Sequence, residues 1–401
     1  MNDSATSRSS LRSFFTGLLP LFVLAHCAHH IINSLTVPLL PMIREDFALT
    51  YTQAGFIASA FSIAYGIGQL PSGWLADRIG ARITITIGIV GVAVAGFLVG
   101  VSQTYIMVVI VMVLMGIAGG GYHPSAAPMI SASVAPEKRG RALGIHLTGG
   151  GISFFLSPLI AAAIATIWGW RGAYLSLSIP TIIFGIIFYV LLKRVQSTRT
   201  ARRETAITHA ETPPVPGERR RLVVIIILNT IIQATYLSIV TYIPLFLVDN
   251  FGISEGAAAS MMALLYSGGL WVSPLGGYLS DRLGRLPVIL TVCFITGPFI
   301  YLLNIVPQGI AFGAFLVILG MIQYMRMPVS EAYVVDHTPE GKRSTIMGIY
   351  YFGNMEVGGL LTPAIGYLID RFGFYTSFSI TGAAILAVFL LCSVFLWKRG
   401  D

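Results

Sequence analysis

Long apolar runs fill almost the whole chain and constrain its fold more than any other feature of the sequence. Each run lasts about 20 to 30 residues before a cluster of charged, Gly or Pro residues, and about 20 residues cross a bilayer core. Hydrophobic residues make up 55% of the 401 residues and charged residues only 10%, so a water-soluble fold would lack the polar groups to cover its surface. The sequence therefore indicates a membrane protein and argues against a soluble enzyme or a nucleic-acid binder.

The breaks between the runs predict an all-α membrane protein with twelve transmembrane helices. Their approximate limits are 14–42, 52–75, 83–101, 104–134, 142–167, 172–192, 222–248, 256–279, 287–305, 308–336, 344–369 and 375–396. The only long connection, 193–221, is rich in Arg and Thr, contains three prolines and cannot bury a core. We interpret it as a linker between two six-helix bundles, 1–192 and 222–401.

Basic residues concentrate in alternate connections between the predicted spans. With a cytoplasmic N-terminus, 21 of the 25 Lys and Arg lie in cytoplasmic segments, and only Arg44, Arg171 and Arg371 lie outside. This bias predicts that both termini and the linker are cytoplasmic in a multi-pass protein of the cell (inner) membrane. The basic residues of the linker fit this topological role, and contact with anionic lipid head groups is the alternative.

The two halves of the chain repeat each other at a nearly constant offset of 204 residues. The repeat is clearest in a loop motif that joins the second span to the third and the eighth to the ninth. Its residues are Gly73, Asp77 and Arg78 in the first copy and Gly277, Asp281 and Arg282 in the second. Six spans were duplicated, and an even number gives parallel, pseudo-symmetric bundles. Because an Asp can meet the positive N-terminal end of a neighbouring helix, we predict that the motif gates the cytoplasmic side. A solvated turn is the alternative.

The repeated Gly-x-Leu-x-Asp-Arg-x-Gly motif, with twelve spans and a basic central loop, resembles the signature of the major facilitator superfamily. The resemblance implies a secondary transporter that works by alternating access, not an enzyme. A finer resemblance, to the fosmidomycin-resistance branch, rests on His30-x-x-Asn33 and on Gly119-Gly-Gly-Tyr-His123-Pro124. Ser34 replaces the Asp expected in that branch, and Met112 replaces the Arg of many drug/proton antiporters.

Three hypotheses about transport follow from this resemblance. The first is export of a small organic anion or anionic drug by proton antiport. The second is uptake of an organic anion by proton symport, because the antiporter marks are incomplete. A transport-inactive membrane sensor is the remote third hypothesis. In each case we expect a monomer in the lipid bilayer, with no cofactor, no metal and no nucleic-acid partner.

Polar side chains inside the first and seventh spans predict one wall of a substrate site, because they are costly unless they face protein or water. The first span carries His26, then His29 or His30, and Asn33 at helical intervals of three and four residues. The seventh span repeats the pattern with Asn229 and Gln233. Hydrogen bonding between packed helices is the alternative role for these side chains.

The fourth and tenth spans predict the opposite walls of this site. Tyr122-His123-Pro124 aligns with Arg326-Met327-Pro328, and Gly-rich or Pro-interrupted segments at corresponding places in two repeats point to a binding site. Each proline removes a backbone hydrogen bond within its span. Arg326 keeps its charge inside the membrane and needs an anion or a carboxylate, so we expect it to hold an anionic substrate.

Acidic residues near Arg326 provide candidates for proton coupling. Glu356 in the eleventh span is the deepest carboxylate, and it either forms a structural ion pair with Arg326 or carries the proton. Glu331 and His30 are the other candidates for the carrier, while Asp336 lies nearer the cytoplasm. The sequence contains no phosphate-binding Gly-x-x-x-x-Gly-Lys loop and no His or Cys cluster with metal spacing, which indicates an ion gradient as the energy source.

Overall fold

The computed structural model describes residues 18–134, 139–197, 218–338 and 343–397, and its regular elements in these ranges are all α-helices. The first half contains α2 (Leu18–Asn33), α3 (Thr36–Asp46), α4 (Tyr51–Ile79), α5 (Ala81–Val101), α6 (Tyr105–Gly119), α7 (Tyr122–Ser133) and α8 (Arg139–Ser197). The second half contains α9 (Glu218–Phe251), α10 (Glu255–Leu283), α11 (Arg285–Leu302), α12 (Ile310–Asp336) and α13 (Arg343–Trp397). Most of the predicted linker, 198–217, lies outside the described residues, and its two ends continue α8 and α9.

The described helices supply the twelve predicted spans. Among the described residues, eight helical segments are long and apolar enough to cross a membrane, and two of them, in α8 and α13, are 52 and 51 residues long. Each of these two contains a glycine joint, at Gly169 (φ 68°) and Gly373 (φ 74°), and therefore counts as two spans. Positive φ at these joints suits a residue without a Cβ. With α4 and α10, each 29 residues long, the described helices make twelve spans.

Two of the predicted spans in the first half are interrupted. The first is divided between α2 and α3 after Asn33, and the fourth is divided between α6 and α7 at Gly120 and Gly121. Consecutive glycines have low helix propensity, which explains the second break. The corresponding spans of the second half, α9 and α12, are continuous although each contains a proline. The breaks place His30 and Asn33 in the last turn of α2 and His123 in the first turn of α7.

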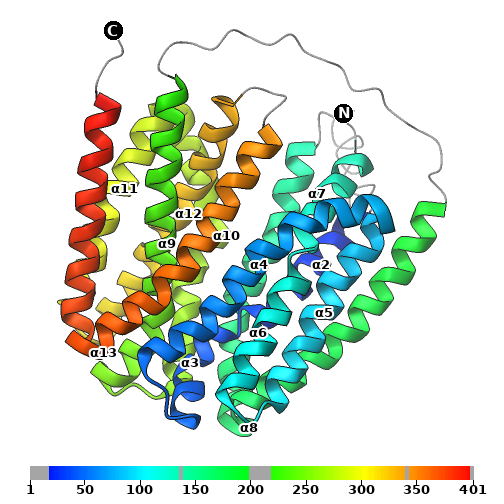
Figure 1. The fold of residues 1–401 in the computed structure, drawn as a ribbon, viewed down its shortest axis with the longest axis horizontal. Coiled ribbons are helices and arrows are strands. Elements are labelled where there is room, and N and C mark those ends of the chain that lie inside the picture. The colour runs from blue at the N-terminus through cyan, green and yellow to red at the C-terminus, as the bar shows by residue number, and fades with distance from the viewer. Residues whose placement is uncertain (1–17, 135–138, 198–217, 339–342, 398–401) are drawn as a thin grey trace, which may run out of the picture.

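The two bundles pack against each other through α4 with α13, α8 with α10, and α3 with α9. Figure 1 shows them converging at the end of the molecule that carries α3 and the joint of α13. We call this the closed end, and we call the opposite end, where α4 and α10 terminate, the motif end. Many large apolar side chains, such as Ile186 and Leu391, are exposed, as expected for a protein surrounded by lipid.

Candidate functional site

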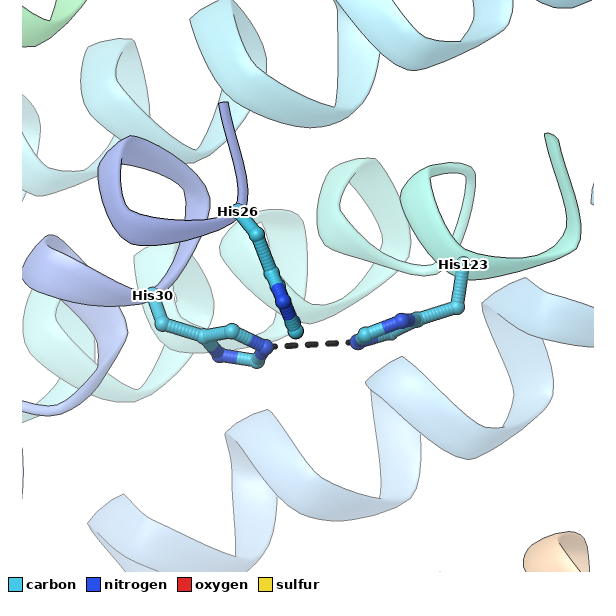
Figure 2. Close-up of side chains that lie close together, drawn as sticks. All are labelled: His26, His30 and His123. Carbon is cyan, nitrogen blue, oxygen red and sulfur yellow. Dashed lines mark hydrogen bonds between the residues drawn. The ribbon is translucent and has the colours of Figure 1, made fainter. Parts of the chain in front are cut away.

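Three histidines of the first half, His26, His30 and His123, form a cluster that we call the histidine triad (Figure 2). His26 and His30 lie one turn apart on α2, and His123 reaches them from the start of α7. The Nε2 atoms of His30 and His123 are 3.2 Å apart, and Asn33 lies 3.3 Å from the other nitrogen of His30. His29 points elsewhere, to the Gly88 carbonyl. His30 thus contacts both Asn33 and His123, and substrate binding by these three residues stays a prediction.

Further aromatic rings pack against the histidines of α2. The ring of His146, on α8, stacks on His26 at 4.3 Å, and the ring of Tyr122 stacks on His29 at 4.4 Å. Tyr122 is fully buried, and its hydroxyl donates to the Phe22 carbonyl at 3.3 Å. Tyr122 thus supports α2 from the core of the first half, whereas direct substrate contact by this residue stays a prediction.

The histidine triad lies beside the boundary between the bundles. The ring of His30 is 5.1 Å from that of Phe154 on α8, and Phe154 is 5.7 Å from Tyr266 on α10. These three aromatic rings connect the two halves of the chain. A ligand held at His30 would therefore lie where relative motion of the bundles changes its surroundings.

Arg326, in the middle of α12, is the largest fully buried side chain of the described residues and is 1% exposed. Its guanidinium donates to Asn229 Oδ1 at 2.8 Å, to Gln323 Oε1 at 3.0 Å and to Gln233 Oε1. Gln323 Nε2 in turn donates to Gln233 at 2.6 Å, and Ser330 donates to Asn229 at 2.7 Å. We call these five residues the arginine cluster. Among the described residues, all hydrogen-bond acceptors of Arg326 are neutral.

Among the described residues, none of the predicted acidic residues forms an ion pair with Arg326. Glu356 Oε1 is buried without a hydrogen bond from the described residues, and it faces Gly66 of α4, where a Cβ would lie 2.5 Å away. The structural ion pair between Glu356 and Arg326 is therefore not formed in this conformation. Glu331 hydrogen-bonds with Tyr351 and experiences the charge of Arg326. Asp336 pairs with Arg285 of α11 at 2.7 Å, within the second half.

Polar contacts join the two bundles at the closed end. Arg44 of α3 pairs with Asp249 of α9 at 3.1 Å, and the Tyr51 hydroxyl donates to the same carboxylate at 2.5 Å. Asp370 of α13 accepts the Tyr51 and Thr52 backbone N–H groups at 2.8 and 2.9 Å, and also the Thr52 hydroxyl. An Asp from the second half thus caps the first turn of α4 and meets its positive helix end.

Glu255, the first residue of α10, also lies at the closed end, next to the predicted span 256–279. Burial and the nearby carboxylates of Glu45 and Asp249 raise its pKa to about 7, and it shares a hydrogen bond with Glu45. Glu45 belongs to α3, so the acidic pair crosses the boundary between the bundles. While the bundles are in contact, protonation of one of the two carboxylates is therefore favoured.

Both copies of the repeated motif lie at the motif end, in the last turns of α4 and α10. Each copy ends at a glycine of positive φ, Gly80 (93°) and Gly284 (86°), which starts the next helix. Asp77 is exposed, the Arg78 guanidinium lies 4.2 Å over the Trp74 ring, and Arg282 lies 4.8 Å over Tyr278. The backbones of Gly73, Gly277 and Asp281 belong to α4 and α10, and their gating role stays a prediction.

Sequence reasoning missed three residues that the fold adds to these sites. His146 lies beside the Gly149-Gly150-Gly151 run, a polar position in an apolar span that could have drawn attention. Gln323 precedes Arg326 by one helical turn, which is also a detectable signal. Asp370 gave no such signal, because its partners are backbone groups of the other bundle.

The fold and its two polar clusters define a multi-pass membrane protein of two duplicated bundles. The Major Facilitator Superfamily model matches residues 22–363 and 225–400, and the chain belongs to this family. Its homologues are transporters, which identifies it as a secondary transporter in general terms.

Relatives and solved structures agree with this assignment. The chain is 25% identical over 376 residues to the probable sulfoacetate transporter SauU of Cupriavidus necator, covering 89% of this chain and 87% of the relative. It is 24% identical over 371 residues to the fosmidomycin resistance protein of Escherichia coli, covering 92% and 90%. A crystal structure of a bacterial homologue of the human lysosomal transporter Spinster, in an inward-facing and unoccupied conformation, superposes with a TM-score of 0.77 at 16% identity, covering 94% and 95%. That last likeness concerns the fold.

Proposed function

We propose that this transporter moves a small organic anion through the boundary between its bundles by alternating access, coupled to protons. The first half would present His30, Asn33 and His123 to the substrate, and the second half would present Asn229, Gln233 and Arg326. The sulfoacetate and fosmidomycin relatives support the choice of substrate class, because both named compounds are organic anions.

The observation that carries the proposal is the environment of Arg326. A buried guanidinium is expensive unless its charge is balanced, and amide oxygens satisfy its hydrogen bonds without neutralising it. Gln233 is half-buried and is the more exposed of the two glutamines in the cluster. A carboxylate, sulfonate or phosphonate that replaced the Gln233 oxygen would accept the same N–H groups and neutralise the charge.

Glu356 is the proposed proton carrier. Its Oε1 lies against α4 without a donor among the described residues, and a neutral acid is buried there at lower cost than a carboxylate. Glu356 is on α13 and Gly66 is on α4, so separation of the bundles would expose this carboxyl to water. Loading and release of a proton would thereby follow the same motion that exposes the substrate.

For the direction of transport, we propose export by antiport. The protein would lie in the cell membrane with both termini on the cytoplasmic side. The bias of basic residues then makes the closed end extracytoplasmic and the motif end cytoplasmic. Proton-coupled uptake is the second candidate, favoured by Met112, a buried apolar residue where many antiporters are expected to carry an Arg. Transport assays in oriented vesicles, with the pH gradient imposed in either direction, separate the two.

Binding of anions to purified protein tests the substrate class directly. We expect sulfoacetate or fosmidomycin to raise the melting temperature, and Arg326→Lys to weaken binding by about 1 to 3 kcal/mol, because one ammonium cannot replace the planar fork. Arg326→Ala should abolish binding. Arg285→Ala is the matched control, since it removes an Arg of the same bundle that pairs with Asp336. If Arg326→Ala binds an anion as tightly as the parent protein, the anion site lies elsewhere.

A further inference from the structure

The sequence shows no cluster with metal-ligand spacing, but the fold gathers the histidine triad closely enough for its three rings to share one cation. One ring nitrogen from each of His26, His30 and His123 lies within 4.8 Å of the others. The His30 and His123 Nε2 atoms are 3.2 Å apart, and two imidazoles on one tetrahedral Zn²⁺, with bonds of about 2.0 to 2.1 Å, hold their nitrogens about 3.3 to 3.4 Å apart. In Figure 2 the tip of His26 reaches toward the line that joins these two atoms.

Hydrogen bonds at the opposite sides of the rings orient these ligands. His26 Nδ1 donates to the His146 carbonyl at 2.9 Å, which leaves its Nε2 as the free lone pair. His30 Nδ1 lies 3.3 Å from Asn33 Oδ1 and 3.4 Å from Asn33 Nδ2, so the Asn33 amide holds the ring with its Nε2 toward His123. Metal-binding histidines commonly donate their second N–H to a carbonyl or carboxylate in this way. Without a metal, His30 and His123 must share one proton, and a cation would displace it.

The kind of ligand indicates the kind of metal. Three imidazoles with no carboxylate or thiolate among them suit Zn²⁺ and the neighbouring divalent metals, and three histidines leave the fourth tetrahedral position open. His30 and His123 are half-buried, so this open position is on the accessible side of the cluster, away from buried His26. We propose that the histidine triad is a binding site for a divalent transition-metal cation of the Zn²⁺ class, with its fourth ligand supplied from outside the protein.

Packing around His26 gives a second line of support for a built site. A Cβ at Gly150 of α8 would lie 2.8 Å from His26 Cε1 and 3.0 Å from its Nε2. The absence of a side chain at this position lets the His26 ring take its place in the triad. A Cβ at Gly144, six residues earlier on the same helix, would meet no atom within 4 Å.

Metal binding to the full-length protein in detergent, purified through a histidine-free tag, tests the proposal without any substrate or ion gradient. Its outcome is therefore independent of the proposed function. We expect calorimetry to give about one Zn²⁺ per chain, and Co²⁺ to give the visible bands of tetrahedral coordination. His26→Gln, His30→Gln and His123→Gln should each weaken binding at least about tenfold. His337→Gln, which alters a histidine of α12's C-terminal cap, should leave it unchanged.

Two further measurements distinguish loss of the metal site from misfolding of the histidine variants. They are a pair of glycine variants and an X-ray absorption spectrum of the unaltered protein. Gly150→Ala should weaken Zn²⁺ binding by displacing His26, while Gly144→Ala should not. X-ray absorption at the zinc edge should show a shell of about three imidazoles. The proposal is overturned if the parent protein binds no Zn²⁺ at micromolar concentration, if the triad variants bind as tightly as His337→Gln, or if the metal shell lacks histidine.

Discussion

Replacing Asp370 by Asn should loosen the closed end of the transporter. Asp370 is the only partner from the second half that the described residues show for the Tyr51 and Thr52 N–H groups, and it also accepts the Thr52 hydroxyl. Asn keeps one acceptor oxygen, turns the other into a donor that opposes these N–H groups, and removes the charge that meets the helix end. The variant should therefore favour separation of the bundles at this end.

The size of the effect can be bounded from the same contacts. Hydrogen bonds to charged groups contribute about 1.5 to 3 kcal/mol each when buried, but Asp370 is exposed, and solvent screening reduces such values strongly. We expect a loss of about 1 to 2 kcal/mol in the closed conformation. Since about 1.4 kcal/mol is a factor of ten, the ratio of open to closed molecules should rise about 5- to 30-fold.

Distances between spin labels can measure this ratio. Gln103 and Gln308 are exposed, lie in connections of the first and second bundle, and can carry labels after the three native cysteines are replaced. The control is Asp46→Asn, which breaks a 2.6 Å ion pair with Arg171 inside the first bundle. Asp370→Asn should enlarge the long-distance population and Asp46→Asn should not. Equal distributions in the two variants would show that the cap does not hold the bundles together.

Three further predictions concern the coupling residue, the motif end and the acidic pair. Glu356→Gln should abolish transport driven by a pH gradient while substrate counterflow survives, and normal pH-driven transport would exclude Glu356 as the carrier. Asp77→Asn should lower transport and raise cysteine labelling from the motif end without changing anion affinity; unchanged labelling and transport would remove its gating role. The raised pKa of Glu255, about 7 against 4.5, means that the closed form is favoured at low pH and loses this advantage as the pH rises from about 4.5 through 7. The open population measured by spin labels should rise over that range, and Glu255→Gln should remove this pH dependence. An equal rise in the parent protein and in Glu255→Gln would show that this acidic pair does not cause it.

Periodicity and repetition were enough to predict the architecture, and the reason is physical. A bilayer requires each span to be long and apolar, so span limits can be found from composition alone. Gly169 and Gly373 are likewise 204 residues apart, and the structure shows them as matching joints with φ of 68° and 74°. The break between α2 and α3 was missed, because Ser34 and Leu35 belong to an apolar run that continues through it.

The candidate site was less predictable than the fold. Helical spacing placed His30 and Asn33 together, since it reports which residues share a face of one helix. It could not show that the His26 ring stacks on His146, 120 residues away, or that Asn229 and Gln233 supply the oxygens around Arg326. Such contacts depend on how helices pack and rotate against one another. The spacing of polar residues along a single helix contains no information about this packing.

The first turn of α4 is capped twice, and this has a consequence for how the transporter opens. Thr50 and Gln53 form a complete capping box, with the Thr50 hydroxyl accepting the Gln53 N–H at 3.2 Å and the Thr50 N–H donating to the Gln53 side chain at 2.9 Å. Asp370 accepts the two backbone N–H groups that the box leaves free, together with the Thr52 hydroxyl. When the bundles part, water can replace Asp370 while the box stays intact. The first turn of α4 would therefore stay helical when the bundles separate. Amide exchange should stay slow at residue 53 even when residues 51 and 52 exchange freely.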